Sequence, residues 1–295
     1  MTQEPHARQR LVHLTDPHLT SLDGVSWRQL GLKQLLGFLS WRRKRRAIHQ
    51  RHMLDSVTEA IARENVDAIV LTGDLVHIGL PQEIAVARGW LDELATVAPI
   101  ILVPGNHDAY TSEALPCFNQ AWDAYLKPAE DCSAYPRLWR LPLVDVIGLT
   151  SACATAPGSA MGRLGDEQFA SLTTLLAESN RDKRERVRCV ALHHPPFRGM
   201  TSRRRSLIED ERLGALLEQH HVDLVLHGHL HHDSKHRVGP HGWCFGTASA
   251  SSVRGPEFAS YRLFDIDAGA GRPQISMTLK TFEGTTFRTT EQFAW

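Results

Sequence analysis

The sequence has few cysteines, no long apolar run and no excess charge of either sign, and each absence excludes a class of protein. No stretch approaches the roughly 18 consecutive apolar residues of a transmembrane helix, and the N-terminal MTQEPHARQR has no apolar signal-peptide core. The five cysteines are scattered without a CxxC pair, which excludes a disulfide framework and is typical of a reducing compartment. We therefore expect a cytoplasmic protein that is neither exported nor membrane-spanning.

The charges balance, because 33 Lys and Arg residues face 33 Asp and Glu residues, so no overall field draws the chain to nucleic acid. Hydrophobic residues make up 42% of the sequence, which is ample for a large buried core. No repeat or low-complexity linker interrupts the chain, which favours one continuous domain over residues 1–295. Histidine is more frequent than in an average protein, with 17 copies that partly gather in tight groups.

Short apolar runs alternate with amphipathic helical patterns over most of the chain. This order predicts an α/β fold in which a largely parallel sheet presents its ligands at the carboxyl ends of the strands. The six predicted strands are residues 11–15, 68–72, 100–103, 144–149, 187–192 and 222–226, and the helices are 53–63, 82–96, 166–178 and 207–220. A second, more antiparallel sheet is predicted from residues 235–238, 243–248, 260–265 and 274–282.

Side chains that commonly ligate metals follow five of the six predicted strands. Each group alone is ordinary turn chemistry, but independent turns have no reason to gather such residues at one edge of a sheet. Carboxylates, imidazoles and an amide without a thiolate suit manganese, iron or zinc, and they fit two ions about 3.5 to 4 Å apart that share a carboxylate. The candidates are Asp16 and His18; Asp74; Asn106, His107 and Asp108; His193 and His194; and His229 and His231.

The order of these residues resembles that of the calcineurin-like metallophosphoesterases. The motifs DxH, GD, GNH(D/E), H and GHxH of that family match Asp16-Pro-His18, Gly73-Asp74, Gly105-Asn106-His107-Asp108, His193 and Gly228-His229-Leu230-His231. The match spans residues 11–231, and HHPP at His193 is similar to the cyclic-nucleotide and glycerophosphodiester branch. The resemblance implies a four-layer αββα sandwich of two mixed β-sheets flanked by helices.

The same resemblance implies roles for the matched residues. His107 would face the scissile bond and give a hydrogen bond or a proton to the leaving-group oxygen, and Asp108 would orient its imidazole. His194 is the alternative to His193. The implied ligands are Asp16, His18 and His231 for a first ion, Asn106, His193 and His229 for a second, and Asp74 as the bridge between them.

The implied cofactors are two divalent metal ions, with manganese first and iron or zinc as alternatives. They would generate a bridging hydroxide that attacks the phosphorus of a phosphodiester or pyrophosphate opposite the leaving group. The chain is thus predicted to be a metal-dependent phosphoesterase with a phosphate-ester substrate.

Residues 24–52 form an inserted apolar segment between the first two motifs, and the segment ends in the basic block RRKRR at 42–46. Tryptophans at each end of the apolar part and a cationic terminus are typical of a helix at a membrane interface. Because the segment begins soon after His18, it could cover or open the metal site. A core or dimer-interface helix and a membrane contact through residues 25–46 both remain open, whereas the neutral total charge argues against nucleic acid.

Two substrate classes and one non-enzymatic role follow from these features. One is a lipid-linked phosphodiester or pyrophosphate, met by a peripheral enzyme on the inner face of the membrane. The other is a soluble cyclic nucleotide or glycerophosphodiester, and residues 203–205 could meet its anionic group. A membrane or nucleic-acid adaptor with structural metals has no use for the pair His107 and Asp108, so this pair favours an enzyme.

Overall fold

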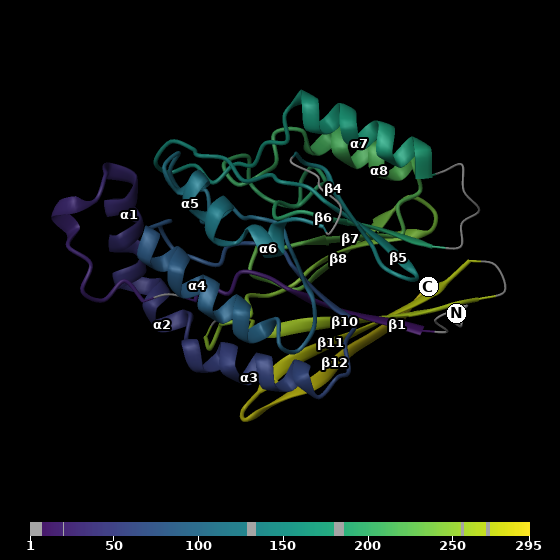
Figure 1. The fold of residues 1–295 in the computed structure, drawn as a ribbon, viewed down its shortest axis with the longest axis horizontal. Coiled ribbons are helices and arrows are strands. Elements are labelled where there is room, and N and C mark those ends of the chain that lie inside the picture. Colours follow the sequence, from purple (N-terminus) through teal and green to yellow (C-terminus); the bar gives the residue numbers. More distant parts are fainter. Residues whose placement is uncertain (1–7, 20, 129–133, 180–185, 255–256, 270–271) are drawn as a thin grey trace.

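A computed structural model describes residues 8–19, 21–128, 134–179, 186–254, 257–269 and 272–295 (Figure 1). Most of the N-terminal stretch and part of the basic stretch near residue 181 lie outside these ranges. The strands are β1 (Arg8–Leu14), β2 (Ala68–Leu71), β3 (Ile100–Leu102), β4 (Arg137–Arg140), β5 (Val144–Gly148), β6 (Val187–Ala191), β7 (Leu224–His227), β8 (Ser234–Val238), β9 (Gly242–Gly246), β10 (Ser260–Asp267), β11 (Gln274–Glu283) and β12 (Thr286–Ala294).

The strands form two mixed sheets of six strands each. The first has the order β12-β11-β10-β1-β2-β3, in which β1, β2 and β3 run parallel and the three C-terminal strands pair antiparallel. The second has the order β4-β5-β6-β7-β9-β8, in which only the edge strands β4 and β8 pair antiparallel. The fold class expected from the family resemblance is thus confirmed.

The division of strands inferred from the apolar runs alone is wrong. The six strands predicted for one parallel sheet are split, with β1, β2 and β3 in the first sheet and β5, β6 and β7 in the second. The C-terminal strands likewise contribute to both sheets, β8 and β9 to one and β10, β11 and β12 to the other. The physical reason is that an apolar run indicates burial, whereas strand partners are set by connections that the run does not encode.

Helices cover the outer faces of both sheets (Figure 1). In chain order they are the 3₁₀ turn η1 (Trp27–Gln29), α1 (Leu32–Ser40), the π-helical turn η2 (Trp41–Arg45), α2 (Arg46–Ile48), α3 (Arg51–Ala62), α4 (Pro81–Leu94), α5 (Ala114–Ala121), α6 (Asp123–Leu126), α7 (Asp166–Ser179) and α8 (Asp210–Gln219). Among the described residues, no helix has the length and apolar character needed to cross a bilayer.

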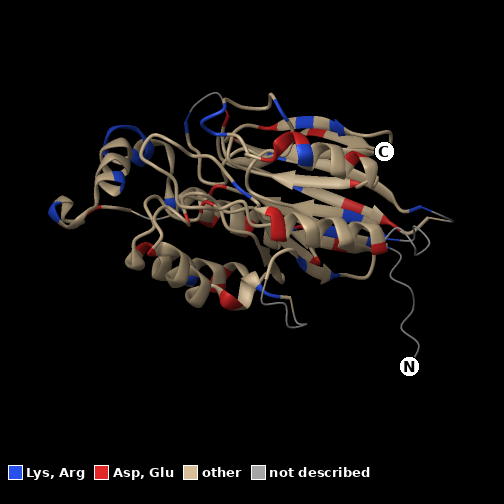
Figure 2. Ribbon diagram, turned by 90° about the horizontal axis from the view of Figure 1, so that it is seen from above, with Lys and Arg blue, Asp and Glu red and all other residues tan. Residues whose placement is uncertain are grey.

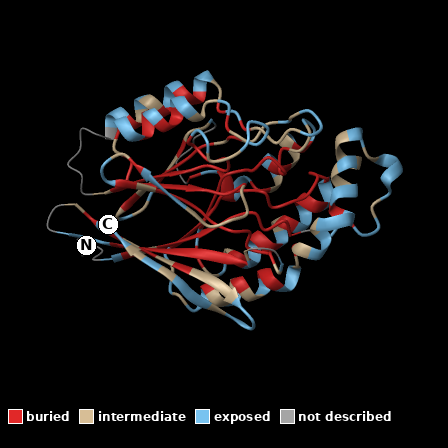
Figure 3. Ribbon diagram, turned by 180° about the vertical axis from the view of Figure 1, so that it is seen from behind, coloured by how far each residue is buried: buried red, intermediate tan, exposed pale blue. Residues whose placement is uncertain are grey.

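Three apolar clusters hold the layers together (Figure 3). One joins the first sheet to α3, α4 and α5, and includes Val57 and Trp90. A second lies between the sheets, where Val70 and Phe264 of the first meet Val146 of the second. The third joins the second sheet to α7 and α8. Both sheets are therefore held face to face, which fixes the loops at their shared end.

The inserted segment projects from the end of the molecule opposite the C-terminus (Figure 2). After the 3₁₀ turn η1, its helical part runs without a break from Leu32 to Ile48 through α1, the π-helical turn η2 and α2. Trp27, Leu32, Leu36 and Leu39 are exposed, whereas Trp41 is buried with Leu22, Ile78 and Leu80. The segment thus has a docked inner face and an apolar outer face.

Candidate metal centre

The predicted ligands lie in loops that follow parallel strands, and these loops meet between the two sheets. Asp16 follows β1 and Asp74 follows β2, and the two loops are tied by the Asp16 N–H, which donates to the Gly73 carbonyl at 3.0 Å. In the second sheet the Gly228 N–H donates to the His193 carbonyl at 3.0 Å, so the loops after β6 and β7 are joined in the same way. The fold therefore brings together residues that are far apart in sequence.

One group of donor atoms surrounds Asp16. Its Oδ1 lies 3.1 Å from His231 Nε2 and 3.9 Å from His18 Nε2. The two imidazole nitrogens are 3.2 Å apart, and His18 Nε2 lies 3.9 Å from Asp74 Oδ2. One donor atom from each of these four residues lies within 4.8 Å of the others, a spacing that suits a single metal ion.

A second group shares Asp74 with the first. Asp74 Oδ2 lies 3.2 Å from His193 Nε2, and His229 Nδ1 lies 3.2 Å from the same nitrogen. The side-chain oxygen of Asn106 lies 3.1 Å from His193 Nε2. Asp74, His193 and His229 form a buried cluster with ligand spacing, so the two groups share one carboxylate.

The protonation of these residues fits a pair of cations. His18 Nδ1–H donates to the Val76 carbonyl at 3.0 Å and His193 Nδ1–H donates to the Thr72 carbonyl at 2.6 Å, so each ring turns its Nε2 toward the centre. Asp16 Oδ1 is buried and accepts no hydrogen bond from the described residues. The lone pairs of acceptor atoms that face one another repel unless a proton or a cation lies between them. The positions of these acceptor atoms therefore suit bound metal ions.

Burial and nearby charges shift the pKa values of these imidazoles in opposite directions. Burial, together with His49, His107 and His231, lowers the pKa of His18 well below its ordinary value, so His18 is neutral. Burial also opposes charge on His193, but the carboxylates of Asp74 and Asp16 outweigh it and raise its pKa to about 9. In the metal-free protein a proton on His193 therefore compensates part of the negative charge.

The backbone is strained at the same positions. Asp16, His18, Asp74, His229 and His231 have φ values of 50°, 38°, 58°, 69° and 57°, in the left-handed region that residues other than glycine rarely adopt. The motif glycines allow the loops to pack this closely: Gly73 has φ of 84°, and a Cβ at Gly105 would collide with the Asp74 side chain. The fold holds these side chains against local preference, as functional sites commonly do.

His107 lies beside the centre with one nitrogen fixed. Its Nδ1–H donates to the His77 carbonyl at 2.5 Å, and its Nε2 accepts a hydrogen bond from Arg45 Nη1 at 2.8 Å. Its ring is perpendicular to that of His18, 4.9 Å away. Burial, followed by the charge of Arg45, lowers the pKa of His107 well below its ordinary value. The imidazole is thus neutral, with its proton on Nδ1 and its Nε2 lone pair directed to Arg45.

The expectation that Asp108 orients the imidazole of His107 is corrected by these contacts. The Asp108 carboxylate instead accepts backbone N–H groups from Asp74 at 2.9 Å, Leu75 at 2.8 Å and Gly105 at 2.8 Å. It binds the loop after β2 to the loop after β3 and so positions Asp74. Its oxygens are engaged by the backbone, and the His77 carbonyl orients His107.

His194 does not compete with His193 for the centre. Its Nδ1 lies 2.8 Å from Ser151 Oγ and its Nε2 lies 3.2 Å from the Ala160 carbonyl, so both nitrogens are engaged elsewhere. Arg205, in the loop after β6, donates to the carbonyl of His229 at 2.8 Å and so supports a predicted ligand. The neighbouring Arg203 instead lines a separate cavity.

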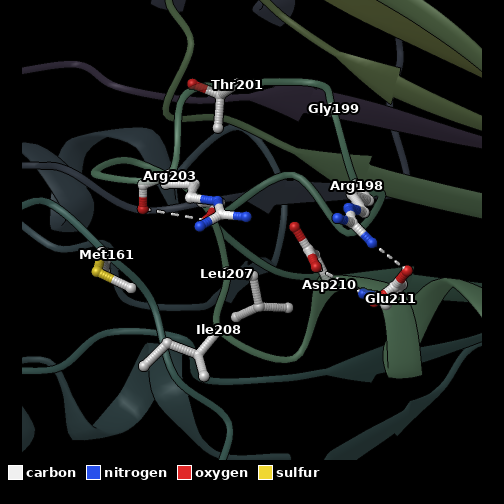
Figure 4. A pocket seen from close by; sticks show the side chains of 10 residues that line it. Met161, Arg198, Gly199, Thr201, Arg203, Leu207, Ile208, Asp210 and Glu211 are labelled. Carbon is white, nitrogen blue, oxygen red and sulfur yellow. Dashed lines mark hydrogen bonds and ion pairs between the residues drawn. The ribbon is translucent and has the colours of Figure 1, made fainter.

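That cavity, of about 470 Å³, lies between Met161 and the loop that leads to α8 (Figure 4). Met161, Leu207 and Ile208 provide its apolar lining, and Arg198 pairs with Glu211 at its edge at 2.5 Å. None of the predicted ligands lines it. Arg203 and Arg205 therefore serve different parts of the molecule, although they stand two positions apart.

The sequence reasoning missed two residues of the inserted segment that reach the centre. His49 lies with His18 and His231 in a group with ligand spacing, and its Nδ1 is held 2.9 Å from Ser251 Oγ. Arg45 contacts His107 as described above. The only signal available was the spacing of four positions between Arg45 and His49, which places them on one face of a helix.

Comparison with known proteins agrees with the family resemblance. Residues 9–233 match the profile of the family described as calcineurin-like phosphoesterase. The glycerophosphodiester phosphodiesterase GpdQ of Enterobacter lignolyticus is 33% identical over 46% of this chain and 44% of its own length. The cAMP/cGMP dual specificity phosphodiesterase of Mycobacterium tuberculosis is 25% identical over 79% of this chain and 64% of its own. The chain thus matches less than two thirds of either relative.

Solved structures show the same fold at low sequence identity. A dimetal phosphatase from Danio rerio aligns with a TM-score of 0.61 at 13% identity, over 97% of this chain and 98% of its own. A purple acid phosphatase from yellow lupin (Lupinus luteus) aligns with a TM-score of 0.64 at 12% identity, over 97% of this chain and 53% of its own. The family match and the two groups of His and Asp residues together indicate a dimetal site. The chain therefore belongs to the calcineurin-like phosphoesterase family.

Proposed function

We propose that this protein hydrolyses phosphodiesters at a centre of two divalent metal ions. The observation that carries the proposal is the position of Asp74, whose carboxylate belongs to both groups of donor atoms. A shared carboxylate is what holds two ions at the separation suited to in-line displacement at phosphorus. The proposed ligands are Asp16, His18 and His231 on one side, Asn106, His193 and His229 on the other, and Asp74 between them.

Different residues of the chain have different roles at this centre. Two divalent ions would lower the pKa of water and polarise the phosphoryl oxygens of the substrate. The carbonyls of Val76 and Thr72 hold His18 and His193 in the tautomer that ligates. His107 is fixed through its Nδ1–H, and its Nε2, which accepts from Arg45, would have to take up a proton before it could donate to the leaving-group oxygen. Manganese is the proposed metal, and iron and zinc suit the same ligands.

The preference for diesters is supported by the relatives. Two of them carry names that state activity on glycerophosphodiesters and on cyclic nucleotides. We therefore expect Mn²⁺-dependent hydrolysis of bis-p-nitrophenyl phosphate that exceeds hydrolysis of p-nitrophenyl phosphate and stops when a chelator is added. Hydrolysis of the monoester alone would reject the diester preference, and hydrolysis indifferent to the chelator would reject the metal centre.

A second candidate, a lipid-linked phosphodiester at a membrane surface, is favoured by one observation. The outer face of α1 exposes Leu32 to 69% and Leu36 to 48%, and Trp27 is exposed to 58% nearby. The exposed side chains of Arg42 and Arg43 adjoin this apolar face, as in interfacial helices that bind anionic lipid.

Co-sedimentation with vesicles containing phosphatidylserine tests the membrane contact. The proposal requires that binding is lost in Leu32→Glu/Leu36→Glu, while hydrolysis of the soluble diester persists. If the unaltered protein stays in the supernatant, the lipid-linked substrate is rejected and the soluble diester remains.

A further inference from the structure

The inserted segment is fastened to the rest of the protein at three places. Gly37 of α1 packs so closely on the loop after β2 that a Cβ there would come within 2.6 Å of the Ile78 side chain. Trp41 is buried in the apolar cluster with Leu22 and Ile78. At the last residue of α2, the Val253 N–H donates to the Ile48 carbonyl at 2.9 Å. These contacts fix η2, which lies between them.

Arg45 is the member of the basic block that turns toward the centre. Arg42, Arg43, Lys44 and Arg46 are exposed, whereas Arg45 is partly buried. Its Nη1 donates to His107 Nε2 at 2.8 Å. Burial lowers the pKa of the Arg45 guanidinium below its ordinary value, and the carboxylates of Asp74 and Asp16 attract it. The guanidinium therefore lies in a poorly solvated place within electrostatic range of the two carboxylates of the proposed metal site.

Among the described residues, this charge has no anionic partner of its own. Arg46 pairs with Asp23 at 3.3 Å, but no carboxylate of the described part of the chain lies within ion-pair distance of Arg45. The neutral His107 accepts one of its five N–H groups, and a desolvated cation normally requires an anion. With metal ions bound, Asp16 and Asp74 would be neutralised and the attraction that they exert on Arg45 would be offset. An anion bound between Arg45 and the centre would supply the negative charge that the guanidinium lacks. It would also replace the attraction that the two carboxylates no longer exert.

We propose that Arg45 binds the non-ester oxygens of the substrate phosphoryl group, so that the inserted segment completes the substrate site. This inference rests on the proposed function for the identity of the substrate. A guanidinium offers paired N–H donors that match two phosphoryl oxygens, which a lysine ammonium does not. The contact with His107 places that fork beside the residue that faces the leaving group. The ligand class is thus a phosphate ester, and inorganic phosphate as product binds in the same way.

Binding of inorganic phosphate to the Mn²⁺-loaded, full-length protein tests this role by calorimetry. We expect Arg45→Gln to weaken binding about tenfold to a hundredfold, the range for loss of a charge-assisted hydrogen-bond pair. Arg45→Lys should restore only part of it, because the fork is lost. Lys44→Gln is the matched control, since Lys44 is exposed in the same turn, and it should bind phosphate as the unaltered protein does. Manganese content, measured on each variant, should stay the same.

The outcomes separate this inference from the proposed function. Phosphate affinity unchanged in Arg45→Gln, or weakened equally in Lys44→Gln, overturns the role of Arg45. So does Arg45→Gln with lost manganese, since Arg45 would then support the metal site. If the unaltered protein binds phosphate through Arg45 but cleaves no diester, the proposed function fails and the anion site stands. If it cleaves the diester and Arg45→Gln has an unchanged KM, the proposed function stands and this inference fails.

Discussion

Asp74 and His193 join the two sheets, because Asp74 Oδ2 lies 3.2 Å from His193 Nε2 although the residues follow strands of different sheets. The same carboxylate belongs to the group formed with Asp16, His18 and His231. The centre therefore depends on how the sheets pack as well as on the loops that carry its ligands.

Metal affinity should rise with pH up to about 9. Burial opposes a proton on His193, but attraction by Asp74 and Asp16 raises its pKa to about 9 in the metal-free protein. Below that pH the ion must displace the proton. The apparent dissociation constant for Mn²⁺ at the position of Asn106, His193 and His229 should therefore fall about tenfold for each unit by which the pH rises. Calorimetry in buffers of different ionisation enthalpy measures the released proton. An affinity that does not change with pH would contradict this assignment.

Asp74→Ala should remove both metal ions and with them all measurable hydrolysis. Each of the two groups of donor atoms loses a carboxylate in this variant, and the negative charge that attracts the ions is halved at the centre. Metal content after dialysis, together with turnover of bis-p-nitrophenyl phosphate, checks both effects. Asp123→Ala, which alters an exposed carboxylate paired with Lys127, is the control that should retain metal and activity.

His107→Ala should keep both ions and lose rate. The imidazole lies beside the centre but bonds to the His77 carbonyl and to Arg45, so its loss leaves the proposed ligands in place. A drop in kcat of about 10² to 10⁴ is expected for a group that assists the leaving oxygen. Metal analysis of the same preparation decides the matter, since loss of manganese would assign His107 to the metal site instead.

Gly37→Ala should loosen the inserted segment without touching the centre. A Cβ at Gly37 would lie 2.5 Å from Tyr110 Oη and 2.6 Å from Ile78 Cγ2, so α1 must move away. Phosphate binding should then weaken in the direction seen for Arg45→Gln, with metal content unchanged. At Gly31 an added Cβ meets only Gln34 Oε1 at 3.8 Å, so Gly31→Ala is the control. Normal phosphate binding in Gly37→Ala would mean that Arg45 does not depend on this docking.

Much of the centre was predictable because its residues follow strands in a recognisable order. Asp16, His18, Asp74 and the GNHD and GHLH residues all come together at the place where parallel strands end. The resemblance also gave the double-sheet fold. The division of strands between the sheets was not predictable from apolar runs, and β4 and β12 escaped notice. Strand β12 is largely exposed on an edge and so lacks the continuous apolar run of a buried strand.

The role of the inserted segment could not be predicted because its residues look alike in sequence. The block at 42–46 reads as a uniform basic tail, yet only Arg45 turns inward while its neighbours are exposed. Which of these side chains turns inward depends on the helical register after Trp41. This register is set by burial of the indole beside Leu22 and Ile78. The place of His49 in the centre could not be predicted either, because its position depends on a contact with Ser251, far along the chain.

The most direct test of a two-ion centre bridged by Asp74 is an anomalous difference map from crystals soaked in Mn²⁺. The account predicts two peaks about 3.5 to 4 Å apart, one on each side of the Asp74 carboxylate. His18 and His231 should contact one peak and His193 and His229 the other. A single peak at full occupancy, or two peaks that do not share Asp74, would contradict it.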